Sequence, residues 1–117
     1  MATYTRDEFV RRVLVELGVL DAEEAPEAVD AVSVGDVTQQ KFEELYEEGL
    51  IPWDIDGDIP GRYFLPLLSI VAAECMTSYR KTANVAILAP KAAAGTAQLW
   101  KFRERAYFPI PTQADYF

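Results

Sequence analysis

The feature that most constrains the fold is an apolar stretch near the middle of the chain, residues 63–79. At helical spacing it carries two adjacent apolar stripes, one of Phe64, Leu68, Val71, Cys75 and Tyr79 and one of Leu65, Ala72 and Met76. A helix that is apolar around most of its circumference has to be covered by other elements. We therefore predict a central bundle helix. Pro66 either starts this helix or kinks it near its first turn, because an interior proline costs about 3 kcal/mol.

A first helix has clear start and stop signals in residues 5–18. Thr5 and Glu8 have the spacing of a capping box, and Gly18 suits a left-handed C-cap. One apolar stripe lies between them, formed by Phe9, Val13 and Leu17. These signals predict a helix over 6–17.

A second helical region follows a polar loop. Pro26 is placed to open a short helical turn through residue 31. Ser33 or Asp36 then caps a longer helix, which Gly49 ends. The outward side of that helix is acidic, with Glu43, Glu44, Glu47 and Glu48. A solvated helix face is the simplest interpretation of such a run.

The segment 50–61 holds two prolines, two glycines and three aspartates, which predicts an ordered loop. Residues 82–88 are expected to form a connection, and Pro90 fits the first turn of a last helix that runs to about Ala106. Alanines and a glycine at 92–97 would let this helix approach a neighbour closely. The apolar residues of this helix recur at the spacing of one helix face. Its C-terminal end is basic, with Lys101, Arg103 and Arg105.

The character of the chain changes after Ala106. Prolines at 109 and 111 disfavour a helix and push the residues before them towards extended backbone. Residues 107–117 include four aromatic residues, which is too many for a disordered tail that binds nothing. We predict an arm that docks on another subunit, with folding back onto its own bundle as the alternative. The residues assigned to partner binding are Tyr107, Phe108, Pro109, Ile110, Pro111, Tyr116 and Phe117.

With 117 residues, the chain is expected to be one all-α unit. The predicted architecture is a small bundle of about four helices over 1–106, with an extended C-terminal arm over 107–117. No apolar stretch approaches the roughly 20 residues that span a bilayer, and no secretory signal is found. We therefore expect no membrane partner and a cytoplasmic place of folding.

The distribution of charge is uneven. The net charge of −8 divides into −12 over residues 1–61 and +4 over residues 62–117. Acidic helices that pack beside a basic one explain this division simply. Alternatively, like subunits, or a subunit and its partner, meet through complementary faces. Nucleic-acid binding by the acidic half is disfavoured, because phosphate contacts need Lys and Arg.

Nothing in the sequence points to catalysis or to a cofactor. The chain has no histidine, which removes the commonest general base and metal ligand together. Its one cysteine, Cys75, lies on an apolar stripe and is interpreted as a core thiol. The segment Asp54–Asp58 fails as a calcium loop, because a loop starting at Asp54 has Ile59 and Leu65 where glycine and glutamate are required. We expect a non-enzyme without metal or cofactor sites.

The layout resembles the head-to-tail adaptor proteins of tailed bacteriophages, and is most similar to those of short-tailed phages. The resemblance rests on a capped first helix, a proline-initiated second region, an alanine-rich last helix with a tail, and three short segments. These segments are Leu17-Gly18-Val19-Leu20, Ile59-Pro60, and Leu65-Pro66-Leu67-Leu68 followed by Val71-Ala72-Ala73. The chain is short for that family, with fewer residues between its helices.

The resemblance implies a virion protein, assembled in the host cytoplasm, that forms a ring of twelve copies under the portal protein. Such a ring closes the DNA channel, presents a platform for tail or nozzle proteins, and lets DNA pass without specific binding. The arm 107–117 would then clasp the portal. The acidic residues 43–48 would line the channel or an intersubunit face, and the sequence leaves both open. A small acidic regulator or DNA mimic, binding a basic partner, is the alternative to an adaptor.

Overall fold

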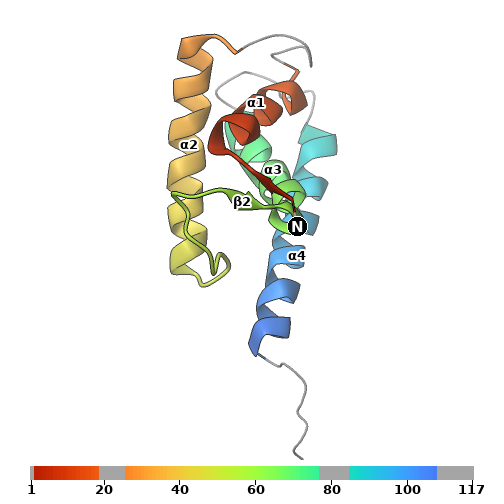
Figure 1. Cartoon of the computed structure of the whole chain (residues 1–117). Helices are drawn as coiled ribbons and strands as arrows, with labels where there is room; N and C mark the ends of the chain where they lie inside the picture. Colours follow the sequence, from red (N-terminus) through yellow and green to blue (C-terminus); the bar gives the residue numbers. More distant parts are fainter. Residues whose placement is uncertain (1, 19–25, 77–84, 108–117) are drawn as a thin grey trace, which may run out of the picture.

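The computed structural model describes residues 2–18, 26–76 and 85–107, and the described part of the chain is a small helical bundle (Figure 1). This confirms the predicted all-α class. The predicted arm from 108 onward lies outside the described residues, so its conformation stays a prediction. The elements are β1 (Thr3–Tyr4), α1 (Arg6–Glu16), α2 (Ala28–Glu47), β2 (Ile59–Pro60), α3 (Gly61–Cys75) and α4 (Val85–Tyr107).

Helix α1 begins at Arg6 as predicted and ends at Glu16, one residue before the predicted end, with Leu17 as its C-cap. The Thr5 backbone N–H donates to Glu8 Oε1 at 2.9 Å, and the Glu8 N–H donates to Thr5 Oγ1 at 3.2 Å. Both halves of the capping box are therefore formed. Gly18 has a φ of +77°, the left-handed conformation expected at the C-terminal end.

Helix α2 runs without interruption, so the predicted short turn followed by a separately capped helix is wrong. Glu27 is the N-cap, and Ser33 and Asp36 lie inside the helix as exposed side chains that do not compete with its backbone bonds. One buried stripe continues through the region where the break was expected, formed by Val34, Thr38, Phe42 and Leu45. The buried Thr38 hydroxyl donates to the Val34 carbonyl at 2.8 Å.

Helix α3 lies in the middle of the bundle (Figure 1) and contains Pro66 in its interior, so Pro66 does not start the helix. Most of the predicted stripe residues are buried, but Leu65 is 60% exposed, which corrects its assignment to the core. The buried face of the helix also includes Tyr63, Leu67 and Ile70.

Helix α4 starts earlier and ends later than predicted. It begins at Val85, so Leu88 lies in the helix and not in a connection, and Pro90 is interior. Leu88 is buried, and this packing carries the helix N-terminally past the proline. Tyr107, assigned to the arm, is the last residue of α4.

Close approach between α3 and α4 depends on Gly95. A Cβ on Gly95 would lie 2.7 Å from the Pro66 carbonyl oxygen and 3.2 Å from the Pro66 Cα. The prediction that small residues let the last helix approach a neighbour is therefore confirmed at this position.

A short strand pair ties the N-terminus to the start of α3. Strands β1 and β2 are antiparallel, with Thr3 opposite Pro60 and Tyr4 opposite Ile59. The Gly61 N–H also donates to the Ala2 carbonyl at 2.9 Å. No local pattern in residues 2–4 or 59–61 predicts this pairing.

Seven aromatic rings form one continuous series of contacts through the core. Successive ring centroids are 4.5 to 5.9 Å apart, and most pairs meet edge to face. In order of contact, the rings are Tyr4, Phe64, Phe9, Phe42, Trp53, Tyr63 and Phe102. The series connects β1 and all four described helices.

Two glycines inside helices give opposite predictions. Gly95→Ala should lower the free energy of unfolding by about 1–3 kcal/mol, because the added methyl group forces α3 and α4 apart. Gly35, in α2, has nothing within 4 Å of its Cβ position. Gly35→Ala should therefore raise the free energy of unfolding by about 0.5–1 kcal/mol through helix propensity alone. Urea titration followed by circular dichroism measures both, and equal effects would contradict the packing argument.

Candidate functional site

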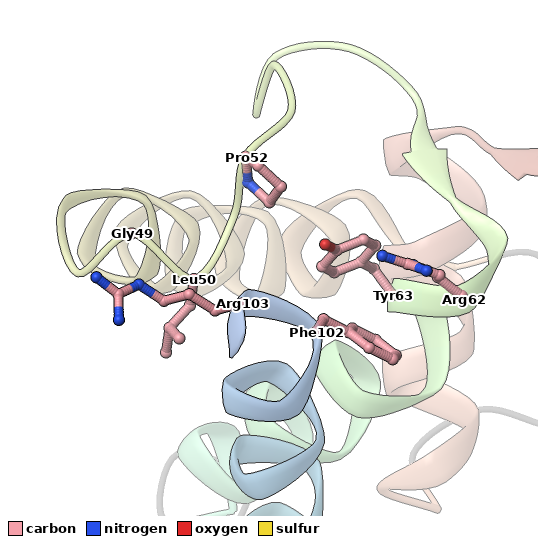
Figure 2. Close-up of a pocket in the computed structure, with 7 residues that line it drawn as sticks. All are labelled: Gly49, Leu50, Pro52, Arg62, Tyr63, Phe102 and Arg103. Carbon is pink, nitrogen blue, oxygen red and sulfur yellow. The ribbon is translucent and has the colours of Figure 1, made fainter. Parts of the chain in front are cut away.

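A hollow of about 290 Å³ opens where the C-terminal end of α2, the start of α3 and the end of α4 meet (Figure 2). We call it the arginine hollow because two arginines line it. Figure 2 shows Arg62 and Arg103 at opposite ends, with Tyr63 and Phe102 between them. Its lining residues are Gly49, Leu50, Pro52, Arg62, Tyr63, Phe102 and Arg103.

Gly49 shapes one end of the arginine hollow. Its φ of +79° ends α2 as predicted, and the Leu50 N–H donates to the Leu45 carbonyl at 2.9 Å. A Cβ at Gly49 would lie 3.2 Å from Arg103 Nε. The glycine therefore ends the helix and leaves room for the arginine at once.

Arg62 lies across the aromatic floor. Its Cζ is 4.5 Å from the ring centroid of Phe102 and 5.5 Å from that of Tyr63. The two rings are 5.1 Å apart and nearly fully buried. Arg62 itself is exposed, and within the described part of the chain it forms no ion pair. The stacked guanidinium keeps its N–H edge for an acceptor.

The three residues of the predicted basic end of the last helix do not form one site. Arg103 is half-buried and lines the arginine hollow, and its Cζ lies 5.3 Å from the ring centroid of Trp100. Lys101 is exposed and does not line it. The side chain of Arg105 lies outside what the structure describes.

Three glutamates of α2 and the glutamate at its C-cap are all exposed and form a surface that we call the acidic strip: Glu43, Glu44, Glu47 and Glu48. Only Glu44 has a basic partner among the described residues, Lys41 Nζ at 3.4 Å. Glu43 accepts a hydrogen bond from Gln39 Nε2 at 2.9 Å. The strip runs to the C-terminal end of α2, where the helix dipole disfavours negative charge. Helix stability therefore does not account for it.

One ion pair between helices joins opposite charges of the two halves. Lys91 of α4 pairs with Glu16 of α1 at 3.2 Å. Lys41 of α2 pairs with Glu74 of α3 at 3.5 Å, but each of these residues carries the minority charge of its own half. The Lys91–Glu16 contact fits the simple interpretation of an acidic helix packed beside a basic one. Arg103 lies next to Gly49, directly after the acidic strip.

The aspartate-rich loop is a turn, as predicted. The Asp56 N–H donates to Asp54 Oδ1 at 3.0 Å, and the Gly57 N–H donates to the Asp54 carbonyl at 3.0 Å. Among residues 2–18, 26–76 and 85–107, no cluster of His, Cys, Asp and Glu is placed to hold a metal ion.

Arg6 is a half-buried cation that contacts three elements of the bundle. It donates to Gln39 Oε1 at 3.0 Å and to the Ile55 carbonyl, and its Cζ lies 4.8 Å from the Phe42 ring centroid. Burial lowers the pKa of the guanidinium, and Asp56 opposes that shift. These contacts give Arg6 a structural role in joining α1, α2 and the loop.

The two tryptophans differ in burial. Trp53 is half-buried between Phe42 and Tyr63 and anchors the loop to the core. Trp100 is 40% exposed, so it is not a core residue.

Sequence reasoning did not find the arginine hollow. The sequence patterns assign no binding role to Arg62, Tyr63 or Phe102. The available signal was an arginine beside a buried aromatic residue directly after the Ile59-Pro60 turn. Such a signal identifies a site only once the partner ring on α4 is known.

No known protein family, curated protein or solved structure was found to match the chain. Within the part of the chain that the structure describes, none of the helices combines the length and apolarity needed to cross a membrane.

Cys75 is expected to be unreactive in the native chain. It is buried, and desolvation, with Glu74 adding to it, raises the pKa of its thiol to about 11. Modification by a thiol reagent at about pH 8 should be slow and should match the rate of unfolding, because only the thiolate attacks. Between the ordinary value of 9.0 and 11, rising pH favours the unfolded state, in which the thiol ionises first. Rapid modification under native conditions would contradict this burial.

The negative charges of the acidic strip are expected to lower the stability of α2. Glu47→Gln removes a charge from the unfavourable end of α2 and should raise the free energy of unfolding by about 0.3–1 kcal/mol at low salt. Glu27→Gln, at the N-cap of the same helix, should lower it by a similar amount. Both effects should shrink in high salt. Thermal unfolding at two salt concentrations measures the pair, and effects of the same sign would contradict the dipole argument.

Proposed function

We propose that this chain is a head-to-tail adaptor of a tailed bacteriophage, a structural protein of the virion. In this proposal twelve copies form a ring under the portal protein, close the DNA channel, and present a platform for tail or nozzle proteins. The resemblance of its sequence to the adaptor family motivates the proposal.

The observation that carries the proposal is that the binding features of the described residues gather at one end of the bundle. Figure 1 shows α4 continuing past the other helices at that end. The arginine hollow lies beside it, and the acidic strip ends there at Gly49. A ring subunit needs two different complementary surfaces. The strip and the hollow are such a pair.

The acidic strip supports a position of the subunit near DNA in which the subunit does not bind the DNA. Glu43, Glu47 and Glu48 lack basic partners among the described residues, so their charge faces solvent. Attraction to DNA grows with the number of phosphates that a protein neutralises, and carboxylates neutralise none. A channel lined by this strip would let DNA slide. On an intersubunit face, the same strip would pair with basic side chains of the next copy.

The C-terminal arm supplies the portal contact in this proposal. Helix α4 delivers it at the end of the bundle, after Tyr107. An aromatic, proline-containing segment is chemically suited to lie in extended form on a partner surface. Tyr116 and Phe117 add aromatic anchors of the kind that dominate protein interfaces.

The acidic strip also favours a second candidate, a small DNA mimic or acidic regulator that binds a basic protein. Stoichiometry separates the two functions. An adaptor binds its portal in about twelve copies, whereas a mimic binds its partner as a monomer or dimer.

The test is co-assembly with the portal protein encoded in the same genome. The full chain is expected to be a monomer alone and to add about twelve copies to each portal ring, because an arm-mediated contact is repeated by the portal symmetry. A variant lacking 108–117 should lose at least about tenfold in affinity, which corresponds to about 1.4 kcal/mol. Native mass spectrometry of portal mixtures measures both.

The truncated variant should keep the circular dichroism spectrum and unfolding midpoint of the full chain, since the described core ends at Phe102. Truncated protein that assembles on the portal as well as the full chain would contradict the role of the arm. A full chain that ignores the portal and binds a basic protein one to one would overturn the adaptor proposal.

A further inference from the structure

We infer that the open face of α3, between α1 and α4, binds the outer face of α2 from a second copy of the chain. We call this site the α3 groove. It adjoins the arginine hollow, because Arg62 and Leu65 lie one helical turn apart on α3. The role of the contact in a ring rests on the proposed function, whereas the contact itself can be measured on the chain alone.

The α3 groove is a hollow of about 400 Å³ lined by residues of α1, α3 and α4. Leu65 lies in it and is 60% exposed, although it belongs to the central helix of the bundle. Ile87 lies one turn before Lys91, which lines the groove, on the same face of α4, and it is 59% exposed. Two large aliphatic side chains beside one hollow form a patch that a partner can cover.

Cations border the α3 groove. Arg12 of α1 is exposed and lines it, and within the described part of the chain it forms no ion pair. Arg62 is exposed at the end of the groove, also without an ion pair to a described carboxylate, and its Cζ lies 4.5 Å from the ring centroid of Phe102. Lys91 is already neutralised by Glu16. The groove therefore suits an occupant that is partly apolar and partly acidic.

The outer face of α2 has both properties. Val29 and Val32 are 77% and 63% exposed. Asp36, Glu43 and Glu47 follow Val32 at intervals of one, two and one helical turns, and all three are exposed without an ion pair to a described cation. Apolar and acidic side chains thus share one side of the helix.

The α3 groove and the outer face of α2 lie on different sides of the bundle. No residue of α2 lines the groove, and Figure 1 shows α2 and α4 on opposite sides of α3. A contact between two different surfaces joins copies head to tail, and it closes into a ring when the rotation between copies allows.

The two surfaces also agree in length and in order. Ile87 lies fifteen residues before Phe102, on which Arg62 stacks, so the apolar and cationic ends of the groove are about 22 Å apart along α4. Val32 lies fifteen residues before Glu47, which gives the same separation of about 22 Å along α2. The second copy's α2 is therefore parallel to α4, with Val32 at Ile87 and Glu47 at Arg62.

The strength of the contact follows from where it has to form. A dissociation constant of about 1 mM leaves the chain monomeric at micromolar concentration. Neighbours bound to one template reach an effective concentration in the millimolar range, so the same contact forms between them.

The experiment traps the contact as a disulfide between two variants of the full chain, Val32→Cys and Ile87→Cys. They are mixed in equal amounts at about 1 mM in a glutathione redox buffer. The parallel register predicts about tenfold more mixed disulfide than disulfide between like chains, because the complex holds the two thiols at a high effective concentration. The matched control mixes Val32→Cys with Arg62→Cys, which lies at the other end of the groove, and should give no such excess.

An exchange of charges tests the ionic end of the contact. Arg62→Glu in the Ile87→Cys chain should lower the yield of mixed disulfide about fivefold, since an attraction becomes a repulsion. Glu47→Lys in the Val32→Cys chain should then restore the yield. Asp58→Lys, at an exposed acidic position outside α2, is the control and should not restore it.

Mixed and like disulfides in random proportion would overturn the contact. A predominant disulfide between two Val32→Cys chains would assign α2 to a symmetric dimer and overturn it as well, and equal trapping at Ile87 and Arg62 would overturn the register. The substituted side chains are all exposed, so the circular dichroism spectrum should stay that of the unmodified chain. No portal is present, so failure of this contact is distinguishable from failure of the adaptor proposal.

Discussion

The seven-ring series is the constraint on which the rest of the structure depends. It starts at Tyr4 in β1, passes through Phe9 and Phe42, and ends at Phe102 in α4. Each ring belongs to a different element from the one before it, so each contact fixes one element against another. Edge-to-face pairs prefer particular angles as well as burial, which gives the core a preferred register. Arg6 covers Phe42 in the middle of the series, and Arg62 covers Phe102 at its end. The two arginines differ in what surrounds them: Arg6 is held by hydrogen bonds inside the bundle, whereas Arg62 faces the hollow.

The position of α4 decides whether the hollow exists. Gly95 lets α4 lie directly on the backbone of Pro66, where any side chain would hold the helices apart. Seven residues further along, about two helical turns, Phe102 meets Tyr63 and Arg62. A small change in the separation of α3 and α4 at Gly95 would therefore shift Tyr63 and Phe102, the two rings that form the floor of the hollow. A densely packed interior transmits such displacements. The candidate site is thus a consequence of core packing at a distance from it.

Local signals in the sequence predicted most of the helices. Contacts between segments that are distant in the sequence were not predicted. The capping box of Thr5 and Glu8 and the left-handed Gly18 and Gly49 each act through their own backbone, so their effects are readable in order along the chain. The small Gly95 indicates a close approach of another element, but not which element that is. The predicted break in α2 failed for the opposite reason. Ser33 and Asp36 favour caps locally, but the buried stripe from Val34 to Leu45 stabilises one continuous helix. The β1–β2 pair and the arginine hollow each need residues more than forty positions apart, Tyr4 with Ile59 and Gly49 with Arg103, and no local pattern specifies such pairings.

The charge distribution gains a sharper meaning from the structure. Opposite halves could have neutralised each other within the bundle, and one ion pair, Lys91–Glu16, does so in part. The other pair, Lys41–Glu74, joins a cation of the acidic half to a carboxylate of the basic half. The acidic strip keeps its carboxylates at the C-terminal end of α2, where the helix dipole disfavours negative charge, and Arg62 stacks on Phe102 nearby. The strip therefore gives up some stability of its own helix. Exposed charges that no neighbour neutralises keep their attraction for oppositely charged groups on other molecules. This is the property that the proposed function requires of the strip.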